Sequence, residues 1–270
     1  MTTSRGTALV TGASSGIGAI YADRLARRGY DLILVARNAE RLQSVAARIA
    51  ETTGRSVEAL QADLNNAMDL RGVEARLRDD TSISLLLNNA GFGGAAPLLQ
   101  SDVDKMEEMI AVNVTALTRL TYAVAPAFVK RGVGTIINIA SIVAIGPEIL
   151  NGVYGASKAY VLALTQSLNH ELADKGLRIQ AVLPGATATD FWQIAGVGGH
   201  ENLPKEIVMR AEDLVDAALA GLDAGETVTI PPLQDGDEWT RYEAARREMS
   251  GHFNHTKPGP RYLKSATAAA

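Results

Sequence analysis

Tyr154 and Lys158 are the first residues whose types and spacing could do chemistry. They stand four residues apart in a stretch with helical periodicity, which places both side chains on one face of a helix. A free tyrosine has a pKa of ~10 and is a poor acid or base at neutral pH, but a neighbouring ammonium group lowers that pKa. The pair therefore predicts general acid–base chemistry in which Lys158 makes the hydroxyl of Tyr154 usable.

Other polar residues stand where an open sheet binds its ligands. Ser141 follows a predicted strand at 135–140, and an Asn-Asn-Ala-Gly segment at 88–91 marks the end of another. Open α/β sheets bind ligands at the carboxyl ends of their strands, so both positions support a site there. Structural alternatives exist, because Ser141 could cap a turn, Asn113 could bridge strands, and Tyr154 could be a buried tyrosine with a satisfied hydroxyl.

A glycine-rich turn follows the first predicted strand and opens the first predicted helix. Its spacing is Gly-x-x-x-Gly-x-Gly over residues 12–18, and no Gly-Lys-[Ser/Thr] follows, which excludes a Walker loop. The glycines permit close approach of the backbone to a pyrophosphate, and the helix N-terminus supplies free N–H groups. The alternative is a purely structural strand-to-helix turn. The residues predicted to bind a dinucleotide here are Gly12, Ser14, Ser15, Gly16, Ile17 and Gly18.

The end of the second predicted strand indicates which dinucleotide is bound. An acidic residue there would bind the ribose 2′-hydroxyl, whereas this chain has Ala36 and then Arg37. A charge-assisted pair with a 2′-phosphate is worth roughly 1.5–3 kcal/mol, so we expect NADP to be preferred over NAD. The alternative is that Arg37 is a solvated surface arginine. Asp63 and Leu64, just after the third predicted strand, are placed to flank an adenine.

Short β-branched runs alternate with longer helical patterns along the chain. Several runs are apolar on both faces, as parallel strands covered by helices must be. We therefore predict a Rossmann-type α/β fold, a doubly wound parallel sheet of about seven strands in three layers. The predicted strands are 7–11, 31–36, 56–61, 83–88, 135–140, 177–183 and 227–230. The predicted helices are 16–28, 39–53, 67–80, 103–130, 152–174 and 212–222.

The composition is that of a globular protein with a large core. Of the 270 residues, 47% are hydrophobic and 21% are charged, and the net charge of −4 lacks the basic field that favours nucleic acid. No run of eighteen apolar residues and no signal-like start occur, so we expect neither a membrane span nor export. With no cysteine and four dispersed histidines, we expect no metal site and a cytoplasmic protein.

The chain is predicted to form one domain at 1–234 and a C-terminal helical extension with a loose tail at 235–270. The extension carries Trp239, Tyr242, Met249 and Phe253 at roughly helical spacing. Within the domain, the glycine-containing stretch at about 186–210 is predicted to be a mobile substrate lid.

Taken in order, these motifs closely resemble the short-chain dehydrogenase/reductase family, over roughly residues 7–230. The pattern Leu34-Val35-Ala36-Arg37 with Arg41-Leu42 resembles the NADP-preferring members of that family. The resemblance implies a seven-stranded sheet, and a homodimer or homotetramer assembled through the helices at 103–130 and 152–174. The motifs that carry it are residues 11–18, residues 88–91, Asn113, Ser141, Tyr154 with Lys158, and Pro184-Gly185.

The resemblance also implies a role for each candidate in the interconversion of a carbonyl and an alcohol with NADP(H). Tyr154 would give a proton to the carbonyl oxygen, and Ser141 would hold that oxygen. Lys158 would bind the nicotinamide ribose and lower the pKa of Tyr154, and Asn113 would hold a water that links Lys158 to solvent. Further cofactor contacts are implied for Asn89, Ala90, Gly91, Pro184, Gly185, Thr187 and Thr189, and Thr187 stands where isoleucine or valine is commoner in the family.

Apolar residues near these positions predict the substrate site. Phe191 and Trp192 would give the lid an apolar inner face. Phe92 and Val143 would line the same cavity, although Val143 could equally be core packing. Because no arginine cluster faces this region, we expect an apolar or mixed ketone, aldehyde or secondary alcohol without a strong anionic group.

Two other functions remain open from the sequence. A catalytically silent dinucleotide-binding sensor or scaffold would keep the fold, but such a protein has no need of a poised tyrosine. A methyltransferase on a related nucleotide fold would tolerate the glycine turn but leaves Arg37 and Tyr154 unexplained. An NADP-dependent oxidoreductase accounts for all of these residues.

Overall fold

The computed structural model of the chain describes residues 5–172 and 174–263. The chain divides into two compact units, residues 1–232 and 233–270, and each is described by itself.

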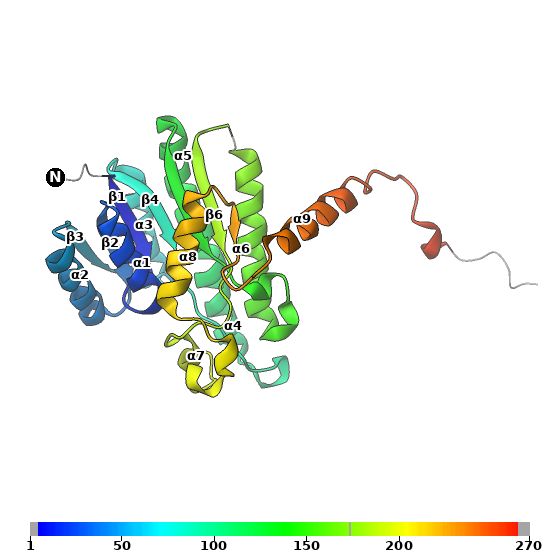
Figure 1. Ribbon diagram of the computed structural model, residues 1–270, viewed down its shortest axis with the longest axis horizontal. Helices are drawn as coiled ribbons and strands as arrows, with labels where there is room; N and C mark the ends of the chain where they lie inside the picture. Colours follow the sequence, from blue (N-terminus) through cyan, green and yellow to red (C-terminus); the bar gives the residue numbers. More distant parts are fainter. Residues whose placement is uncertain (1–4, 173, 264–270) are drawn as a thin grey trace, which may run out of the picture. The chain divides into compact units, whose positions relative to one another are not determined.

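Among the described residues, one parallel sheet of seven strands organises the first unit (Figure 1). The strands are β1 (Thr7–Thr11), β2 (Asp31–Ala36), β3 (Val57–Gln61), β4 (Ile83–Asn88), β5 (Gly134–Ile139), β6 (Leu177–Val182) and β7 (Val228–Thr229). Their order is β3-β2-β1-β4-β5-β6-β7, so the chain changes direction across the sheet between β1 and β4. The crevice outside the carboxyl ends at such a switch point is where these sheets bind ligands. The predicted parallel sheet is confirmed.

Helices cover both faces of the sheet. They are α1 (Gly16–Arg27), α2 (Ala39–Thr53), α3 (Ala67–Asp79), α4 (Val103–Ile110), α5 (Leu117–Arg131), α6 (Gly152–Glu171), α7 (Phe191–Ile194) and α8 (Ala211–Asp223). Successive side chains of a strand point to opposite faces, so Ala8 and Val10 enter one core and Leu9 enters the other. The first core is closed by α1, α2 and α8, and the second by α3, α5 and α6. The predicted three-layer arrangement is confirmed.

Several predicted elements differ from the structure in extent, most of them by one residue at an end. The helix predicted at 103–130 is interrupted, because a π-helical segment, Ala111–Ala116, separates α4 from α5. A π segment changes the hydrogen-bond spacing without changing which residues are apolar, so periodicity does not reveal it. The helix predicted at 152–174 ends at Glu171. The strand predicted at 227–230 is only Val228–Thr229, which pair with Ala181 and Val182 of β6.

The segment predicted to be a mobile lid at about 186–210 has secondary structure of its own. It contains α7 and two 3-10 turns, at His200–Asn202 and Lys205–Ile207. A parallel bridge pairs Thr187 with Met209, and the N–H of Met209 donates to the carbonyl of Ala186 at 2.9 Å. The lid is therefore a closed loop with joined ends.

The second unit contains a helix of 15 residues, α9 (Gly236–Ser250). Asp235 caps its N-terminus by accepting a hydrogen bond from the N–H of Asp237. Trp239 and Tyr242 belong to this helix, and their rings stack on each other with centroids 5.3 Å apart. The helix ends at Ser250, so Phe253 lies outside it, although the spacing in the sequence predicts that Phe253 belongs to the helix.

An ion network joins α1 to α8. Arg24 donates to Asp216 at 2.7 Å and to Asp23 at 2.9 Å, and Arg27 donates to Asp23 at 2.9 Å. Asp23 is only 6% exposed. Burial acts to raise the pKa of its carboxyl group, but hydrogen bonds from Arg27 and Arg24 outweigh burial and hold that pKa below its usual range. A carboxyl group with a lowered pKa stabilises the fold above its unfolded-state pKa, and this contribution is lost as the pH falls through the folded-state pKa.

We expect Asp23→Asn to lower the free energy of unfolding at neutral pH by about 1.5–3 kcal/mol, because charge-assisted hydrogen bonds to a buried carboxylate are lost. Urea unfolding measures this difference in the free energy of unfolding, which should shrink as the pH is lowered through the folded-state pKa of Asp23, below the usual aspartate range. Asp79→Asn is the control, because Asp79 meets Arg78 only at 4.0 Å on the exposed surface. An equal loss in the free energy of unfolding for Asp23→Asn and Asp79→Asn would contradict the expected role of the network.

Candidate active site

Hydrogen bonds join the carboxyl ends of β1 and β4 at the switch point. The hydroxyl of Thr11 accepts from the N–H groups of Asn89 and Ala90, both at 3.0 Å. The same hydroxyl donates to the carbonyl of Leu87 at 3.2 Å. The side-chain amide of Asn89 donates to the carbonyls of Thr11 at 2.9 Å and Gly12 at 3.1 Å. These bonds fix the glycine turn after β1 against the Asn-Asn-Ala-Gly turn after β4.

The glycines of the first turn are required by its geometry. Gly12 and Gly16 have φ values of +66° and +53°, which residues with a side chain rarely adopt. A Cβ atom on Gly18 would lie 2.3 Å from the carbonyl oxygen of Gly12 and 2.5 Å from Nδ2 of Asn89. Helix α1 therefore begins in direct contact with the turn, which supports the predicted close packing of the dinucleotide cradle.

The N-terminus of α1 is open to an anion. Ser15 is its N-cap residue, but the side chain of Ser15 makes no capping hydrogen bond, and the first turn of the helix carries no acidic residue. Free N–H groups and a partial positive charge remain there. Ser14 and Ile17 are half-buried in the same turn. The residues present therefore fit the pyrophosphate of a dinucleotide.

The residues predicted to hold the adenosine end lie after two neighbouring strands. Arg37 is exposed directly after β2, and its carbonyl accepts a hydrogen bond from Gln61 at the end of β3 at 3.1 Å. Asp63 is half-buried, and its carboxylate accepts from the N–H of Asn65 at 3.0 Å. Leu64 is buried at 8% exposure. The structure therefore brings Arg37, Asp63 and Leu64 to one edge of the crevice.

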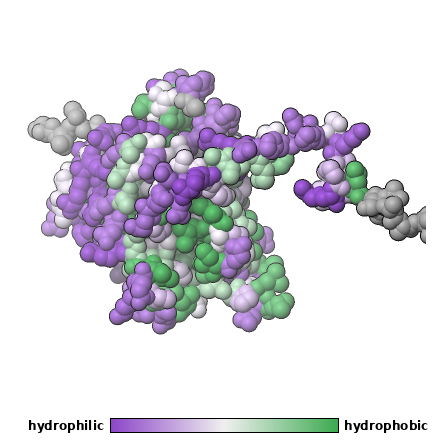
Figure 2. All heavy atoms as spheres, turned by 45° about the vertical axis from the view of Figure 1, so that its right-hand side comes forward, coloured by the Kyte–Doolittle hydropathy of each residue, from purple (hydrophilic) through white to green (hydrophobic). Residues whose placement is uncertain are grey.

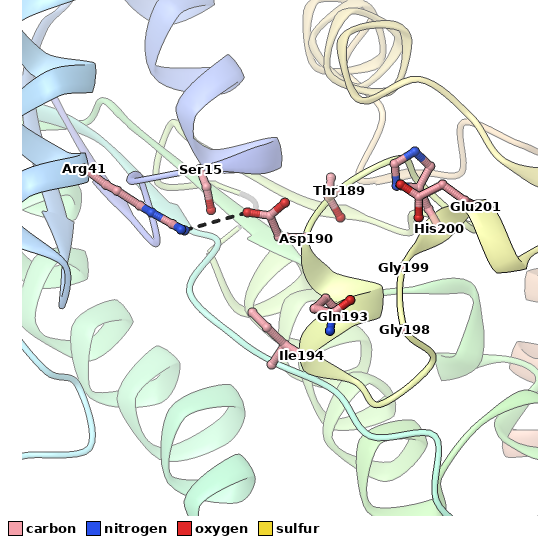
Figure 3. Close-up of a pocket in the computed structure, with 10 residues that line it drawn as sticks. All are labelled: Ser15, Arg41, Thr189, Asp190, Gln193, Ile194, Gly198, Gly199, His200 and Glu201. Atoms are coloured by element: carbon pink, nitrogen blue, oxygen red, sulfur yellow. Dashed lines mark ion pairs between the residues drawn. The ribbon is translucent and has the colours of Figure 1, made fainter.

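A cavity of about 500 Å³ is bounded by the glycine turn, the first turn of α2 and the lid (Figure 3). Arg41 of α2 points across it toward Asp190 at the start of α7, with Nη1 and Oδ2 3.8 Å apart. Ser15 is predicted to bind a dinucleotide, and Arg41 belongs to the pattern that resembles NADP-preferring members, so this cavity adjoins the predicted cofactor region. Its lining residues are Ser15, Arg41, Thr189, Asp190, Gln193, Ile194, Gly198, Gly199, His200 and Glu201.

Three of the four catalytic candidates meet beyond the carboxyl end of β5. The hydroxyl of Tyr154 lies next to Ser141, whose side chain acts to lower the pKa of that hydroxyl. The ammonium nitrogen of Lys158 lies 5.8 Å from the centroid of the Tyr154 ring and donates to the carbonyl of Ile139 at 2.9 Å. Ser141, Tyr154 and Lys158 are each less than 9% exposed. Ser141 follows β5 directly, whereas Tyr154 and Lys158 lie one turn apart on α6.

Burial shifts the pKa values of Tyr154 and Lys158 in opposite directions. Burial raises the pKa of Tyr154 to about 12, against the lowering effect of the Ser141 side chain. Burial lowers the pKa of Lys158 to about 8. Lys158 is not among the groups that shift the pKa of Tyr154 in the protein without cofactor, so its lowering effect stays a prediction. The ammonium group donates to the Ile139 carbonyl, and the lost hydration of the phenolate dominates.

The side chain of Asn113, the fourth candidate, makes hydrogen bonds to other groups of the protein. Its Oδ1 accepts from the N–H of Phe92 at 3.1 Å, and its Nδ2 donates to the carbonyl of Phe92 at 2.9 Å and to Ser157 at 3.1 Å. A Cβ atom on Gly91 would lie 2.8 Å from Oδ1 of Asn113 and 3.5 Å from Nζ of Lys158. Asn113 therefore ties the segment after β4 to α6 beside Lys158. The water between Asn113 and Lys158 stays a prediction.

The segment after β6 lies between Ser141 and the glycine turn. The carbonyl of Pro184 accepts from the hydroxyl of Ser141 at 3.3 Å. The hydroxyl of Thr187 donates to the carbonyl of Gly185 at 3.0 Å. The methyl group of Thr189 lies 3.3 Å from the place that a Cβ on Gly16 would take. The segment thus connects the catalytic and cofactor regions, as its predicted contacts require.

Apolar side chains surround the ring of Tyr154. Val143 and Met109 are buried against it, and Phe92 and Phe191 pack on the same cluster. The ring of Phe191 lies 5.6 Å from that of Tyr154 between centroids, at an interplanar angle of 45°. The structure therefore brings Phe92, Val143 and Phe191 together at Tyr154, as the sequence predicts.

Trp192 occupies a different place from Phe191. Its indole N–H donates to the carbonyl of Thr187 at 2.8 Å, and the residue is 9% exposed. The rings of Trp192 and Phe191 meet edge to face with centroids 5.3 Å apart. Trp192 therefore supports Phe191 from within the lid.

Hydrophobic atoms gather at the end of the first unit that carries α4 and α7 (Figure 2). Leu98 and Leu99, between β4 and α4, are 82% and 94% exposed, and Ile194 of α7 is 64% exposed. Exposed apolar surface of this kind marks sites that bind apolar ligands or partners. The surface at the carboxyl ends of the strands is therefore suited to an uncharged ligand.

Sequence reasoning missed Asp190 and Gly93. Asp190 follows the Thr-Ala-Thr segment without any motif of its own, and only the fold brings it to Arg41. Gly93 lies against the rings of Phe191 and Tyr154. Its place two residues after the Asn-Asn-Ala-Gly segment is a local signal that could have drawn attention to it.

No helix within the described ranges is long and apolar enough to cross a bilayer. In the same part of the chain, no three or more histidine, cysteine, aspartate or glutamate side chains form a group that could hold a metal ion.

Known proteins are similar to this chain in both sequence and fold. The family model for short chain dehydrogenases matches residues 6–196. A short-chain dehydrogenase from Sphingobium yanoikuyae, solved in complex with NADPH, is 49% identical, with a TM-score of 0.91 over 95% of this chain and 100% of that chain. A bulky-bulky ketone specific alcohol dehydrogenase from Comamonas testosteroni is 45% identical, with a TM-score of 0.89 over 97% of this chain and 100% of that chain. An uncharacterized oxidoreductase of Staphylococcus epidermidis is 32% identical over 83% of this chain and 93% of its own length.

The family match spans the glycine turn, the polar residues after β4 and β5, and the Tyr154–Lys158 pair, and it extends into the lid. The chain belongs to the short-chain dehydrogenase/reductase family of oxidoreductases.

Proposed function

We propose that the protein interconverts a ketone or aldehyde and its alcohol, with NADP(H) as the hydride donor or acceptor and Tyr154 as the general acid or base. The observation that carries this proposal is the burial of Tyr154 next to Ser141, with Lys158 one helical turn away on α6. A hydroxyl pair of this kind can bind one carbonyl oxygen from two directions. A protein that only bound a dinucleotide would gain nothing from it.

In the proposed reaction, the bound dinucleotide supplies or receives a hydride at the carbonyl carbon. Ser141 donates a hydrogen bond that holds the carbonyl oxygen in place. Tyr154 donates its proton to the same oxygen in the reducing direction and removes that proton in the oxidising direction. With a pKa of about 12, Tyr154 is protonated at neutral pH, which is the state that reduction requires.

The proposed substrate is an apolar ketone with substantial groups on the carbonyl carbon. The solved relative from Comamonas testosteroni is described as specific for bulky-bulky ketones. In this chain, Phe92, Val143 and Phe191 pack around Tyr154. Leu98 and Leu99, a few residues after Phe92 in the sequence, are exposed. These apolar residues favour an uncharged ligand.

The proposed preference for NADP over NAD rests on charge. Arg37 is exposed at the end of β2, where members that select NAD would be expected to carry an acid. Arg41 lines the cofactor-side cavity with Ser15 and adds a second guanidinium group. The solved relative from Sphingobium yanoikuyae is in complex with NADPH.

We also infer a homodimer or homotetramer in the cytoplasm. Tyr122 of α5 and Tyr160 of α6 are 64% and 38% exposed in the single chain, which supports an interface on these helices. The absence of cysteine is consistent with a reducing compartment. The mass of the particle in solution decides between dimer and tetramer.

The first prediction concerns turnover. We expect NADPH oxidation with aryl and alkyl ketones, and we expect Tyr154→Phe to lower kcat by a factor of about 10²–10⁴ while NADPH still binds, because only the proton donor is lost. Absorbance at the reduced nicotinamide band measures turnover, and fluorescence titration measures binding. Tyr242→Phe, on an exposed tyrosine of α9, is the matched control. If NADPH binds but a broad ketone and aldehyde panel shows no turnover, the dinucleotide-binding sensor becomes the better reading.

The second prediction concerns cofactor choice. We expect Arg37→Ser to weaken NADPH binding by about 10- to 150-fold and to leave NADH binding nearly unchanged, because only NADPH carries the 2′-phosphate. Dissociation constants for both dinucleotides give the ratio. Arg48→Ser removes the same charge from an exposed position on α2 and controls for the loss of net charge. Parallel weakening of NADPH and NADH would rule out a selective role.

The third prediction concerns pH. Lys158 has a pKa of about 8, so it loses its positive charge as the pH rises through that value, whereas Tyr154 keeps its proton until about 12. We therefore expect kcat/KM for ketone reduction to be level near neutral pH and to fall above about 8. A reduction profile that stays level to about pH 10 would contradict this assignment.

A further inference from the structure

The lid places the ring of Phe191 in a recess that exists only because residue 93 is glycine. A Cβ atom on Gly93 would lie 2.4 Å from Cζ and 2.9 Å from Cε2 of Phe191, and 3.2 Å from Cε2 of Tyr154. The φ angle of Gly93 is not in the left-handed range, so the backbone itself would accept alanine. The absence of a side chain is therefore required by the two rings and not by the turn.

The backbone around Gly93 is held from two sides. The carbonyl of Gly94 accepts from the N–H of Asn151, the N-cap residue of α6, at 3.3 Å. The side chain of Asn151 donates to the carbonyl of Ala96 at 2.7 Å. On the lid side, the N–H of Ala95 donates to the carbonyl of Ala195, just after α7, at 3.0 Å. A methyl group on residue 93 would thus displace the ring of Phe191 more readily than the backbone.

Phe191 is the movable member of this contact. It is half-buried, whereas its neighbour Trp192 is buried and fastened by the bond from its indole N–H to Thr187. The ring of Phe191 lies beside that of Tyr154 at 45° between planes, so it borders the hydroxyl region without stacking over it. Movement of this one ring would change the room beside the reacting oxygen.

We propose that Gly93 is a specificity-determining residue, and that its recess accommodates Phe191 so that a ketone with two large substituents can reach Tyr154. The inference rests on the proposed function and names what sets substrate size at that site. When the recess is filled, the ring of Phe191 has to take up the space of one substituent. When the ring is removed, that space is enlarged.

The kinetic test compares phenyl butyl ketone with phenyl methyl ketone, which differ only in the second substituent. We expect Gly93→Ala to lower the ratio of kcat/KM for the butyl over the methyl ketone by about tenfold or more, and Phe191→Ala to raise it. In the Phe191→Ala background, adding Gly93→Ala should change the ratio by less than about twofold, because the clashing ring is gone. Gly94→Ala is the matched control, since a Cβ there meets nothing closer than 3.5 Å.

A second readout does not depend on turnover. Trp192 and Trp239 are the two tryptophans of the chain, so Trp239→Phe leaves Trp192 as the reporter. We expect Gly93→Ala to change the emission and acrylamide quenching of Trp192, because the ring that meets it edge to face has moved, while Gly94→Ala leaves both unchanged. Titration with the two ketones in the presence of NADP(H) then gives their dissociation constants in every variant.

These measurements separate failure of the inference from failure of the proposed function. If no ketone is reduced but Trp192 responds and the butyl ketone loses affinity in Gly93→Ala, the recess controls ligand size and the proposed reaction is wrong. If Gly93→Ala leaves Trp192 and the ketone ratio unchanged, the inference is overturned. An equal effect of Gly93→Ala with and without Phe191 also overturns it.

Discussion

The joint between β1 and β4 is the constraint on which the rest of the site depends. The helices that follow these two strands pack on opposite faces of the sheet, so a crevice opens at the strands' carboxyl ends, and polar backbone groups there need partners. Thr11 and Asn89 satisfy these groups with each other across the joint. The same bonds set the distance between the glycine turn, which begins at Gly12, and the segment after β4, which leads to Gly91 and Gly93.

Burial of the reacting groups is the second organising feature. Tyr154 and Lys158 stand on the inner face of α6, so each is moved toward its neutral form. For tyrosine the neutral form is the acid, and for lysine it is the base. The protein without cofactor therefore keeps Tyr154 protonated. Ser141 works against this shift, since its side chain acts to lower the pKa of Tyr154.

The fold was readable from the sequence because its signals are local. Runs such as 32–35 are apolar on both faces, and the glycine turn announces both the end of β1 and the start of α1. The catalytic candidates were also readable, since Ser141 and Tyr154 stand at positions that a strand end and a helix turn define. The π segment, the bridge from Thr187 to Met209 and the recess at Gly93 were not readable, because each depends on contacts between distant parts of the chain. The shifted pKa of Tyr154 was missed for the same reason, since burial is a property of the folded protein.

The bridge between Thr187 and Met209 has a consequence for how this protein can change over evolution. It closes the lid at its base, so the residues between the two ends form a loop whose anchorage does not depend on its length. Lengthening such a loop costs only closure entropy, which rises by about 0.6 kcal/mol for each doubling of length. The chain can therefore acquire insertions, or exchange this loop as a cassette, while β6, α8 and the ion network that joins α8 to α1 stay as they are.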